Sequence, residues 1–284
     1  MEIIVGKTSG FCFGVKNAIG KTEEQLENET EVFCLGELVH NKQVIEKLES
    51  KGAKFINDIK DAKSKVIIRA HGAERKIYEF AKNNNIEIID LTCPKVSAIH
   101  KIAEKYVNEE YYILLIGQIG HPEIVATESF CGQNYNIIEG IEDVDSAMKT
   151  YSKTKKNKLL VLAQTTYSLD KFNKIVEKIK MEEPNVEVKN TICNATKERQ
   201  EETIKIARKV DAMIIVGGKH SSNTNKLYEL SNKYCENVQI VETLKELDIN
   251  KLKNCETVGI MAGASTPNES VEGIVTKLKN VING

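Results

Sequence analysis

Short apolar runs alternate with amphipathic stretches along most of the chain. The apolar runs predict strands at residues 2–5, 66–69, 86–91, 159–163, 186–189, 212–216 and 256–262. Stretches with helical spacing lie between or after them, at residues 74–82, 170–179, 225–234 and 271–281. Strands that alternate with helical stretches of about 10–15 residues are typical of β-α-β units on a parallel sheet. The pattern therefore predicts an α/β protein with mostly parallel sheets.

A set of three markers recurs three times, and each copy carries one cysteine. Each cysteine follows an apolar run and precedes a helix-like run. The cysteines are 81 and 100 residues apart, and the glycines of the second marker repeat these two steps. The equivalent positions are Cys12, Cys93 and Cys193; Gly36, Gly117 and Gly217; and Ala70, Ala163 and Ala262. Self-similarity of this kind indicates repeated structural units, so we expect the three cysteines to be spatially equivalent.

The repeat predicts three similar small α/β domains, at residues 14–93, 94–190 and 191–284. The third copy lacks its last, cysteine-bearing strand. Residues 1–13 supply the missing piece, so they should pack as a strand of the C-terminal domain. Domains of this size are within the usual range. Three like domains closed in this way favour a pseudo-threefold arrangement.

Composition narrows the class of protein. An apolar share of 41% and a charged share of 29% fit a globular protein in water. A net charge of -1 offers no electrostatic case for nucleic acid or an anionic membrane. No segment approaches a membrane span, and the start does not read as a signal peptide. Together with an odd count of seven cysteines, this predicts a cytoplasmic protein whose thiols stay reduced.

Three equivalent cysteines allow two kinds of metal site. Three thiolates could bind zinc with one open position, or an iron–sulfur cluster with one iron not bound by protein. A helix start after each cysteine would lower the pKa of its thiol. The alternative is that all three are small buried apolar residues. That alternative is our interpretation of the cysteines without repeat partners, Cys34, Cys131, Cys235 and Cys255.

Polar side chains follow the predicted strands at the edge where parallel sheets bind ligands. They are His40, His71, His121, Thr165, Ser221, Ser222, Asn223 and Ser265. Hydroxyls and helix starts suit a phosphate or diphosphate, although helix capping would also explain the serines. Glu123, two residues from His121, could relay a proton; alone it would read as a surface glutamate. His100 lies inside a helical run, and we interpret it as structural.

These motifs, taken in order, resemble one known family. They are FCFGV at residues 11–15, GELVHN at 36–41, RAHG at 69–72, DLTCP at 90–94, GQIGHPE at 117–123, QTT at 164–166, ICNATKERQ at 192–200, SSN at 221–223 and AGASTP at 262–267. The match to 4-hydroxy-3-methylbut-2-enyl diphosphate reductases, also called the IspH or LytB family, spans essentially the whole chain.

The resemblance implies the last step of the non-mevalonate isoprenoid pathway. It implies a central 4Fe-4S cluster on Cys12, Cys93 and Cys193 with an open apical iron, and Glu123 as proton donor. The eight polar loop residues become substrate contacts, and a ferredoxin or flavodoxin is implied as electron donor. Two alternatives stay open at this point: an iron–sulfur dehydratase acting on a small anionic substrate, and a non-catalytic zinc-binding module.

Overall fold

The computed structural model describes residues 1–29 and 31–283, in which strands and helices alternate. The strands are β1 (Glu2–Val5), β2 (Val32–Leu35), β3 (Ala53–Ile56), β4 (Lys65–Ile68), β5 (Glu87–Asp90), β6 (Tyr112–Ile116), β7 (Tyr135–Ile138), β8 (Leu159–Ala163), β9 (Glu187–Val188), β10 (Ala212–Val216), β11 (Asn237–Val241) and β12 (Thr257–Ala262). The α-helices are α1 (Phe13–Asn28), α2 (Lys42–Ser50), α3 (Arg75–Asn83), α4 (Pro94–Asn108), α5 (Pro122–Glu128), α6 (Val144–Ser152), α7 (Leu169–Glu182), α8 (Asn194–Ala207), α9 (Ser222–Ser231) and α10 (Asn268–Asn283).

The strands form three sheets of four strands each, with the orders β3-β2-β4-β5, β7-β6-β8-β9 and β1-β12-β10-β11. Every strand pairing within them is parallel. The predicted α/β class with parallel sheets is therefore confirmed. The strand that leads to a repeat cysteine, β5, β9 or β1, lies at one edge of each sheet. The strands that lead to the alanine and glycine markers come next to it, in the same order each time.

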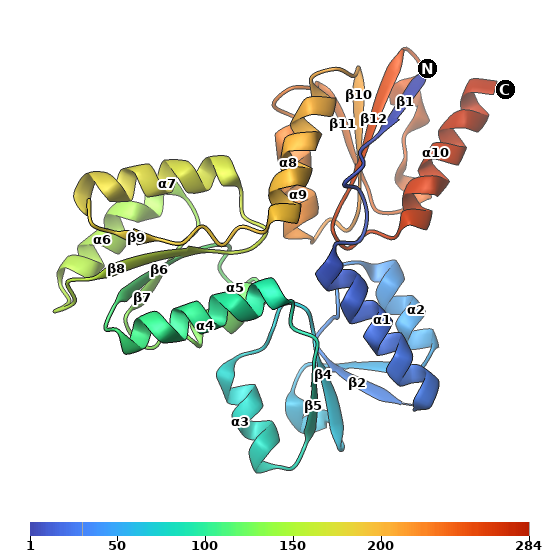
Figure 1. Cartoon of the computed structure of the whole chain (residues 1–284). Coiled ribbons are helices and arrows are strands. Elements are labelled where there is room, and N and C mark those ends of the chain that lie inside the picture. Colours follow the sequence, from blue (N-terminus) through green and yellow to red (C-terminus); the bar gives the residue numbers. More distant parts are fainter. Residues whose placement is uncertain (30, 284) are drawn as a thin grey trace. The chain divides into compact units, whose positions relative to one another are not determined.

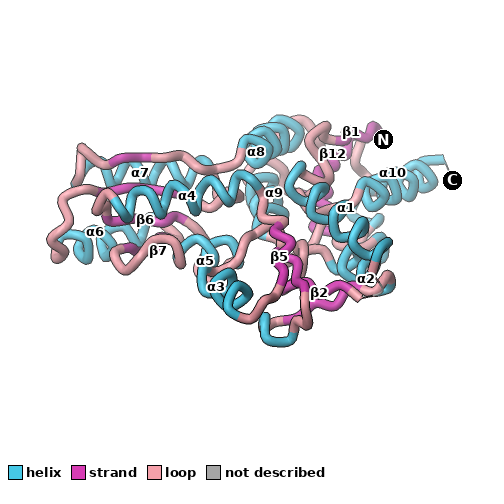
Figure 2. The backbone as a smooth tube through the Cα atoms, turned by 60° about the horizontal axis from the view of Figure 1, so that its bottom comes forward, coloured by secondary structure: helices cyan, strands magenta, loops and turns pink. Residues whose placement is uncertain are grey.

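Contacts divide the chain into two compact units. The first, unit 1, contains residues 1–16, residues 39–47 and the chain from Asn194 on. Its sheet includes β1, which pairs with β12 in parallel from Glu2 opposite Thr257 to Val5 opposite Ile260. Figure 2 shows these two strands side by side in magenta. The first strand of the chain thus completes the sheet formed by its last third.

The sheet of unit 1 is covered on both faces. Apolar side chains of α8 and α9, such as Ile206 and Leu227, pack with Met213 on one face. On the other face, Ile274 and Leu278 of α10 pack with the sheet. Figure 1 shows the same layers, with α8 and α9 on one side of β10 and β12 and α10 on the other. Strands buried on both faces are near-continuously apolar, as β10 is.

The second unit, unit 2, contains residues 17–38 and 48–193 and holds the other two sheets. In the sheet centred on β6 and β8, Ile99 of α4 and Ile124 of α5 pack on one face. Met148 of α6 and Phe172 of α7 pack on the opposite face, as Figure 1 also shows for these helices. Both central strands are buried along their whole length. This packing holds the loops after β6 and β8 in place.

Two helices, α9 and α10, begin three residues earlier than their apolar spacing predicts. α9 begins at Ser222, because the Ser221 side chain accepts a hydrogen bond from the backbone N–H of Thr224 and caps the helix. α10 begins at Asn268, directly after Pro267. No helix in the described part of the chain is long and apolar enough to cross a membrane. The three-domain division at residues 93/94 and 190/191 stays a prediction.

Candidate active site

All predicted site residues lie after the carboxyl ends of strands, where parallel sheets bind ligands. His40 follows β2, His71 follows β4, His121 and Glu123 follow β6, Thr165 follows β8, the serines and Asn223 follow β10, and Ser265 follows β12. The repeat cysteines follow β1, β5 and β9, each of which is one of the two edge strands of its sheet. Apart from His40, which belongs to unit 1 although β2 belongs to unit 2, each of these strands contributes its polar side chains to the carboxyl edge of its own sheet.

The three repeat cysteines have the same backbone anchor. In each case the cysteine N–H donates a hydrogen bond of 3.0 Å to a carbonyl in the loop after the neighbouring strand. The bonds run from Cys12 to Ala264, from Cys93 to Ala70 and from Cys193 to Thr165. A helix starts at the next residue each time. The sequence repeat is therefore also a repeat of local structure.

The seven cysteines, all in described parts of the chain, form no disulfide, and they differ in burial. The three repeat cysteines are half-buried, whereas Cys34, Cys131 and Cys235 are buried. Burial raises the pKa of Cys34 to about 12, and burial together with the Glu128 charge raises that of Cys131 to about 12. Such thiols are poor thiolate ligands. Cys255 is half-buried, less buried than we expected, and packs against the apolar core of the sheet of unit 1.

Glu123 is a buried carboxyl group held by one residue. Its side chain is 2% exposed, in the first turn of α5. The backbone N–H of Thr165 donates to Oε1 and the Thr165 hydroxyl donates to Oε2, each at 2.6 Å. Burial raises the pKa of Glu123 to about 7, against the lowering effect of these two bonds. A glutamate with this pKa can hold and release a proton near neutral pH.

Thr165 joins this carboxyl group to a repeat cysteine. Its carbonyl accepts the backbone hydrogen bond from Cys193, while its N–H and hydroxyl serve Glu123. All three residues belong to unit 2. A candidate proton donor and a candidate metal ligand are therefore attached to the same loop residue.

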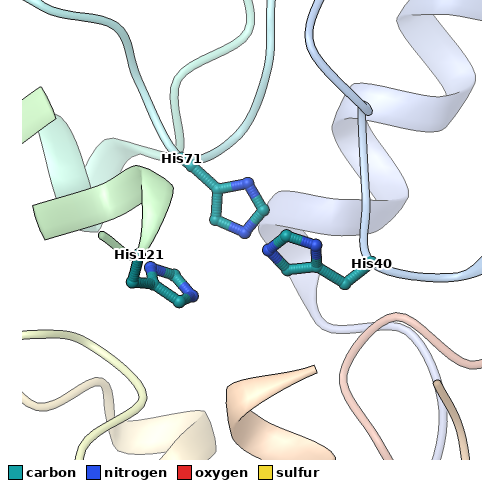
Figure 3. Close-up of side chains that lie close together, drawn as sticks. All are labelled: His40, His71 and His121. Atoms are coloured by element: carbon teal, nitrogen blue, oxygen red, sulfur yellow. The ribbon is translucent and has the colours of Figure 1, made fainter. Parts of the chain in front are cut away.

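Two imidazoles lie close to each other in unit 2. The rings of His71 and His121 meet edge to face, with their centroids 5.4 Å apart (Figure 3). His121 caps α5, and its Nδ1 accepts from the backbone N–H of Glu123 at 3.1 Å. Because Nδ1 accepts, the ring proton of neutral His121 lies on Nε2. Nε2 is thus the atom that can donate to an anion.

Unit 1 carries the buried amide of Asn223. The residue is 4% exposed, and within the described residues neither its Oδ1 nor its Nδ2 has a hydrogen-bond partner. Buried polar groups without partners are rare and costly. The two Asn223 amide atoms lie in the first turn of α9, beside the capping hydroxyl of Ser221. This arrangement suits a polar ligand that would supply the missing partners.

The loop that carries His40 is fixed on unit 1 by its backbone. The Ser265 hydroxyl donates to the His40 carbonyl at 3.2 Å. A Cβ at Gly218 would lie 2.6 Å from the same carbonyl oxygen, so this close approach requires glycine. The side chains of Ser265 and Asn223 and the loop of His40 therefore belong to one unit.

Comparison with known proteins decides the family. A family model described as LytB protein matches residues 3–279.

The chain belongs to the LytB family.

Relatives of the chain are similar over their whole length. A protein of Clostridioides difficile (strain 630) named 4-hydroxy-3-methylbut-2-enyl diphosphate reductase is 40% identical, and the match covers 99% of this chain and 100% of that protein. A protein of the same name from Aquifex aeolicus (strain VF5) is 36% identical, with 100% and 98% covered. The family resemblance of the motifs is thereby confirmed.

Solved structures of reductases share the fold. The E-1-hydroxy-2-methyl-but-2-enyl-4-diphosphate reductase of Plasmodium falciparum matches with a TM-score of 0.91 at 34% identity, over 98% of this chain and 87% of that chain. A structure described as (E)-4-hydroxy-3-methyl-but-2-enyl diphosphate reductase, the terminal enzyme of the non-mevalonate pathway, matches with a TM-score of 0.71 at 36% identity, covering 99% and 100%.

Some side chains around this LytB site were missed from the sequence. Gln164 accepts from the backbone N–H of Gln118 and donates to the Thr166 hydroxyl, so it joins two of the loops. Its sequence signals are its place before Thr165 and in the QTT motif at residues 164–166. Arg199 and Glu202 contact the loop before Cys12, more than 180 residues away in the chain. No local pattern could have indicated those contacts.

His100 has the structural role expected for it in this LytB chain. It is buried in α4 and stacks on Phe130 with centroids 4.4 Å apart. Burial lowers the pKa of His100 to about 4, so the ring is neutral at neutral pH. A Cβ at Gly72 would lie 2.8 Å from its Cε1. His100 therefore packs under the loop that carries His71.

Proposed function

We propose that this protein is a 4-hydroxy-3-methylbut-2-enyl diphosphate reductase. It would take up two electrons and two protons, remove the hydroxyl group of the substrate as water, and give isopentenyl and dimethylallyl diphosphate. The names of its full-length relatives support this assignment. The observation that carries it is the buried Glu123, whose pKa of about 7 and attachment through Thr165 to the Cys193 loop suit proton delivery beside a metal.

The donor set fits an iron–sulfur cluster. Cys12, Cys93 and Cys193 share a backbone anchor after the edge strands and are half-buried, whereas Cys34, Cys131 and Cys235 are buried. Three thiolates without a fourth protein ligand suit a 4Fe-4S cluster with an open apical iron. When bound, such a cluster would supply electrons and Lewis acidity. We propose that the three sheets surround it in pseudo-threefold fashion, in domains 14–93, 94–190 and 191–284 completed by residues 1–13.

Glu123 would provide the proton through Thr165. A protonated Glu123 donates to the Thr165 hydroxyl oxygen, which turns its own hydrogen toward the substrate. The 2.6 Å separation of the two oxygens suits this exchange. Protonation makes the substrate hydroxyl a better leaving group, and a positioned acid contributes about 10²–10⁴-fold to rate.

The polar loop residues would hold the diphosphate. His121 offers Nε2–H, and Asn223 offers a buried amide without protein partners in the described structure. The remaining proposed contacts are His40, His71, Thr165, Ser221, Ser222 and Ser265. Hydrogen bonds to a charged group are worth about 1.5–3 kcal/mol each. Together they would fix the reacting carbon relative to the cysteines.

The proposed setting is the cytoplasm, with a reduced ferredoxin or flavodoxin as transient electron donor. The small net charge of -1 fits a small-molecule enzyme rather than a partner of nucleic acid or of an anionic membrane.

The test is anaerobic reconstitution of the full chain with iron and sulfide, followed by turnover with and without a chemical reductant. We expect brown protein that forms both products only with reductant. Turnover without electrons would identify a dehydratase instead, and zinc in place of iron would identify a metal-binding module. Cys93→Ser should lose iron, whereas Cys255→Ser, a half-buried control, should keep it. Equal loss in both would contradict the ligand assignment.

A further inference from the structure

The loop before Cys12 is held by two charged side chains of α8. The Glu202 carboxylate accepts from the backbone N–H groups of Lys7 and Thr8, at 2.9 and 2.8 Å, and from the Thr8 hydroxyl at 2.6 Å. Arg199 donates from Nε to the Thr8 carbonyl and from Nη2 to the Gly10 carbonyl, at 2.7 and 2.8 Å. Five hydrogen bonds thus join one helix face to a four-residue stretch of loop.

Arg199 and Glu202 are three residues apart on α8, so they lie on the same face of the helix. Arg199 is 4% exposed, and its guanidinium is turned to the loop rather than to solvent. Burial alone would raise the pKa of Glu202, but the hydrogen bonds from Thr8 and Lys7 outweigh it and hold the pKa below the usual range. Glu202 is therefore charged, and an anion accepts such bonds more strongly than a neutral group.

Besides longer-range bonds such as those between Thr191 and Ala163, each of the other two cysteine loops contains a local hydrogen bond from a backbone N–H to a side chain. Asp90, three residues before Cys93, accepts the backbone N–H of Thr92 at 2.9 Å. Asn190, three residues before Cys193, accepts the backbone N–H of Ile192 at 3.1 Å. These are local bonds between neighbours in the chain, which Asp and Asn commonly make.

The Cys12 loop has a serine where the other loops have Asp or Asn. Ser9 is three residues before Cys12, and its hydroxyl accepts from the backbone N–H of Ala262 instead. The loop also contains Gly10, whose φ of 95° is a conformation that a chain adopts readily only at glycine. A loop that contains such a glycine and has no Asp or Asn at this position depends on contacts with other parts of the fold.

We propose that Arg199 and Glu202 are positioning residues that hold the Cys12 loop and so pre-arrange this thiol for the cluster. The proposal rests on the proposed function, because it takes Cys12 as a cluster ligand. α8 begins at the residue after Cys193, so the helix that follows one proposed ligand holds the loop before another. Breaking the pair should loosen Cys12 and leave Cys93 and Cys193 as they are.

The test compares full-length variants with controls on the same helix. Glu202→Gln is paired with Glu201→Gln, and Arg199→Gln with Lys205→Gln, since Glu201 and Lys205 are exposed. In metal-free protein, the alkylation rate of each cysteine is read by mass spectrometry of its peptide. Hydrogen–deuterium exchange of residues 6–12 is measured alongside it. Iron per chain and the electron paramagnetic resonance spectrum of the reduced, reconstituted protein complete the set.

We expect Glu202→Gln and Arg199→Gln to speed alkylation of Cys12 by about tenfold, as loss of one charge-assisted bond would allow. Cys93 and Cys193 should keep the parent rate, and Arg199→Lys should fall between the parent and Arg199→Gln. The reconstituted variants should bind less iron or give an altered spectrum. An unchanged Cys12 rate, or an equal rise at all three cysteines, would overturn the proposal. Absence of iron from the parent would instead refute the proposed function, while the alkylation result still decides the role of the pair.

Discussion

Two glutamates in this protein make nearly the same hydrogen bonds, but their pKa values are shifted in opposite directions. Glu123 in unit 2 accepts from the N–H and hydroxyl of Thr165, and Glu202 in unit 1 accepts from the N–H and hydroxyl of Thr8. Burial raises the pKa of Glu123 to about 7, whereas the pKa of Glu202 is lowered. The same local motif can therefore hold a proton or a fixed negative charge.

Two physical differences separate the glutamates. Glu123 is 2% exposed, so desolvation of its charge is the dominant effect. Glu202 is only partly buried and accepts a third bond, from the N–H of Lys7, which favours the charged form. A carboxylate–threonine pair thus acts as a proton donor or as a loop clamp according to solvent access and one additional donor.

The largest expected effect is on turnover. Glu123→Gln keeps the shape and hydrogen bonding of the side chain but has no acidic proton, so turnover of the reconstituted protein should fall about 10²–10⁴-fold. Glu202→Gln should change turnover only in proportion to the iron that it loses. The measurement is the rate per bound iron with a chemical reductant. A Glu123→Gln rate equal to that of the parent would remove Glu123 from proton delivery.

The second effect is on stability, and its sign should differ between the glutamates. The pKa of Glu123 is near 4.5 in the unfolded chain and about 7 in the folded protein. Its contribution to the free energy of unfolding is therefore fully present below pH 4.5 and is lost as the pH rises through about 7. Glu123→Gln should therefore become more stable than the parent across this window, by up to about 3 kcal/mol.

The lowered pKa of Glu202 has the opposite effect on the pH dependence of stability. Its contribution is present above about 4.5 and is lost as pH falls through the lowered value, so Glu202→Gln should be less stable than the parent near neutral pH. Urea unfolding of metal-free parent and both variants from pH 4 to 8 checks both signs. Stability curves that diverge from the parent in the same direction for the two variants would show that the pKa values of Glu123 and Glu202 are not shifted in opposite directions.

Much of this site could be predicted from the sequence, because its signals are local. The regular spacing of the cysteines and the apolar runs before them predicted that Cys93 and Cys193 follow strands. This was possible because residues close in the chain determine where a strand ends. The burial of Glu123 was not predictable in this way, because α5 and the Thr165 loop come together only in the folded sheet. The contacts of Glu202 with Thr8 likewise join opposite ends of the chain, through a first strand that pairs with the last.

A smaller effect is expected from the hydroxyl beside Glu123. Thr165→Val removes a bond that lowers the pKa of Glu123, so the alkaline limb of the pH–rate profile should move to higher pH. Turnover should also fall by about tenfold or more, because the hydroxyl no longer passes the proton on. Thr165→Ser, which retains the hydroxyl, should restore the parent profile. A Val variant with the parent rate and profile would exclude the relay.

The smallest effect is expected from Thr8, the threonine that bonds Glu202. Thr8→Val removes one of three bonds to Glu202 and leaves the two backbone bonds. We expect a loss of about 0.5–1.5 kcal/mol in the free energy of unfolding and an unchanged pH–rate profile. Urea unfolding and the rate profile are measured together. A shifted profile in Thr8→Val would show that the two threonines are not distinct in role.

The protonation state of Glu123 is the most direct test of its role as proton donor. Difference infrared spectroscopy of parent minus Glu123→Gln, with ¹³C-labelled glutamate, reports the protonated carboxyl band as pH changes. We expect a band that is present in the parent, absent in the variant and lost with a midpoint near pH 7. A Glu123 that is already ionised at pH 5 would contradict this role, because a group without a proton at neutral pH cannot serve as the donor.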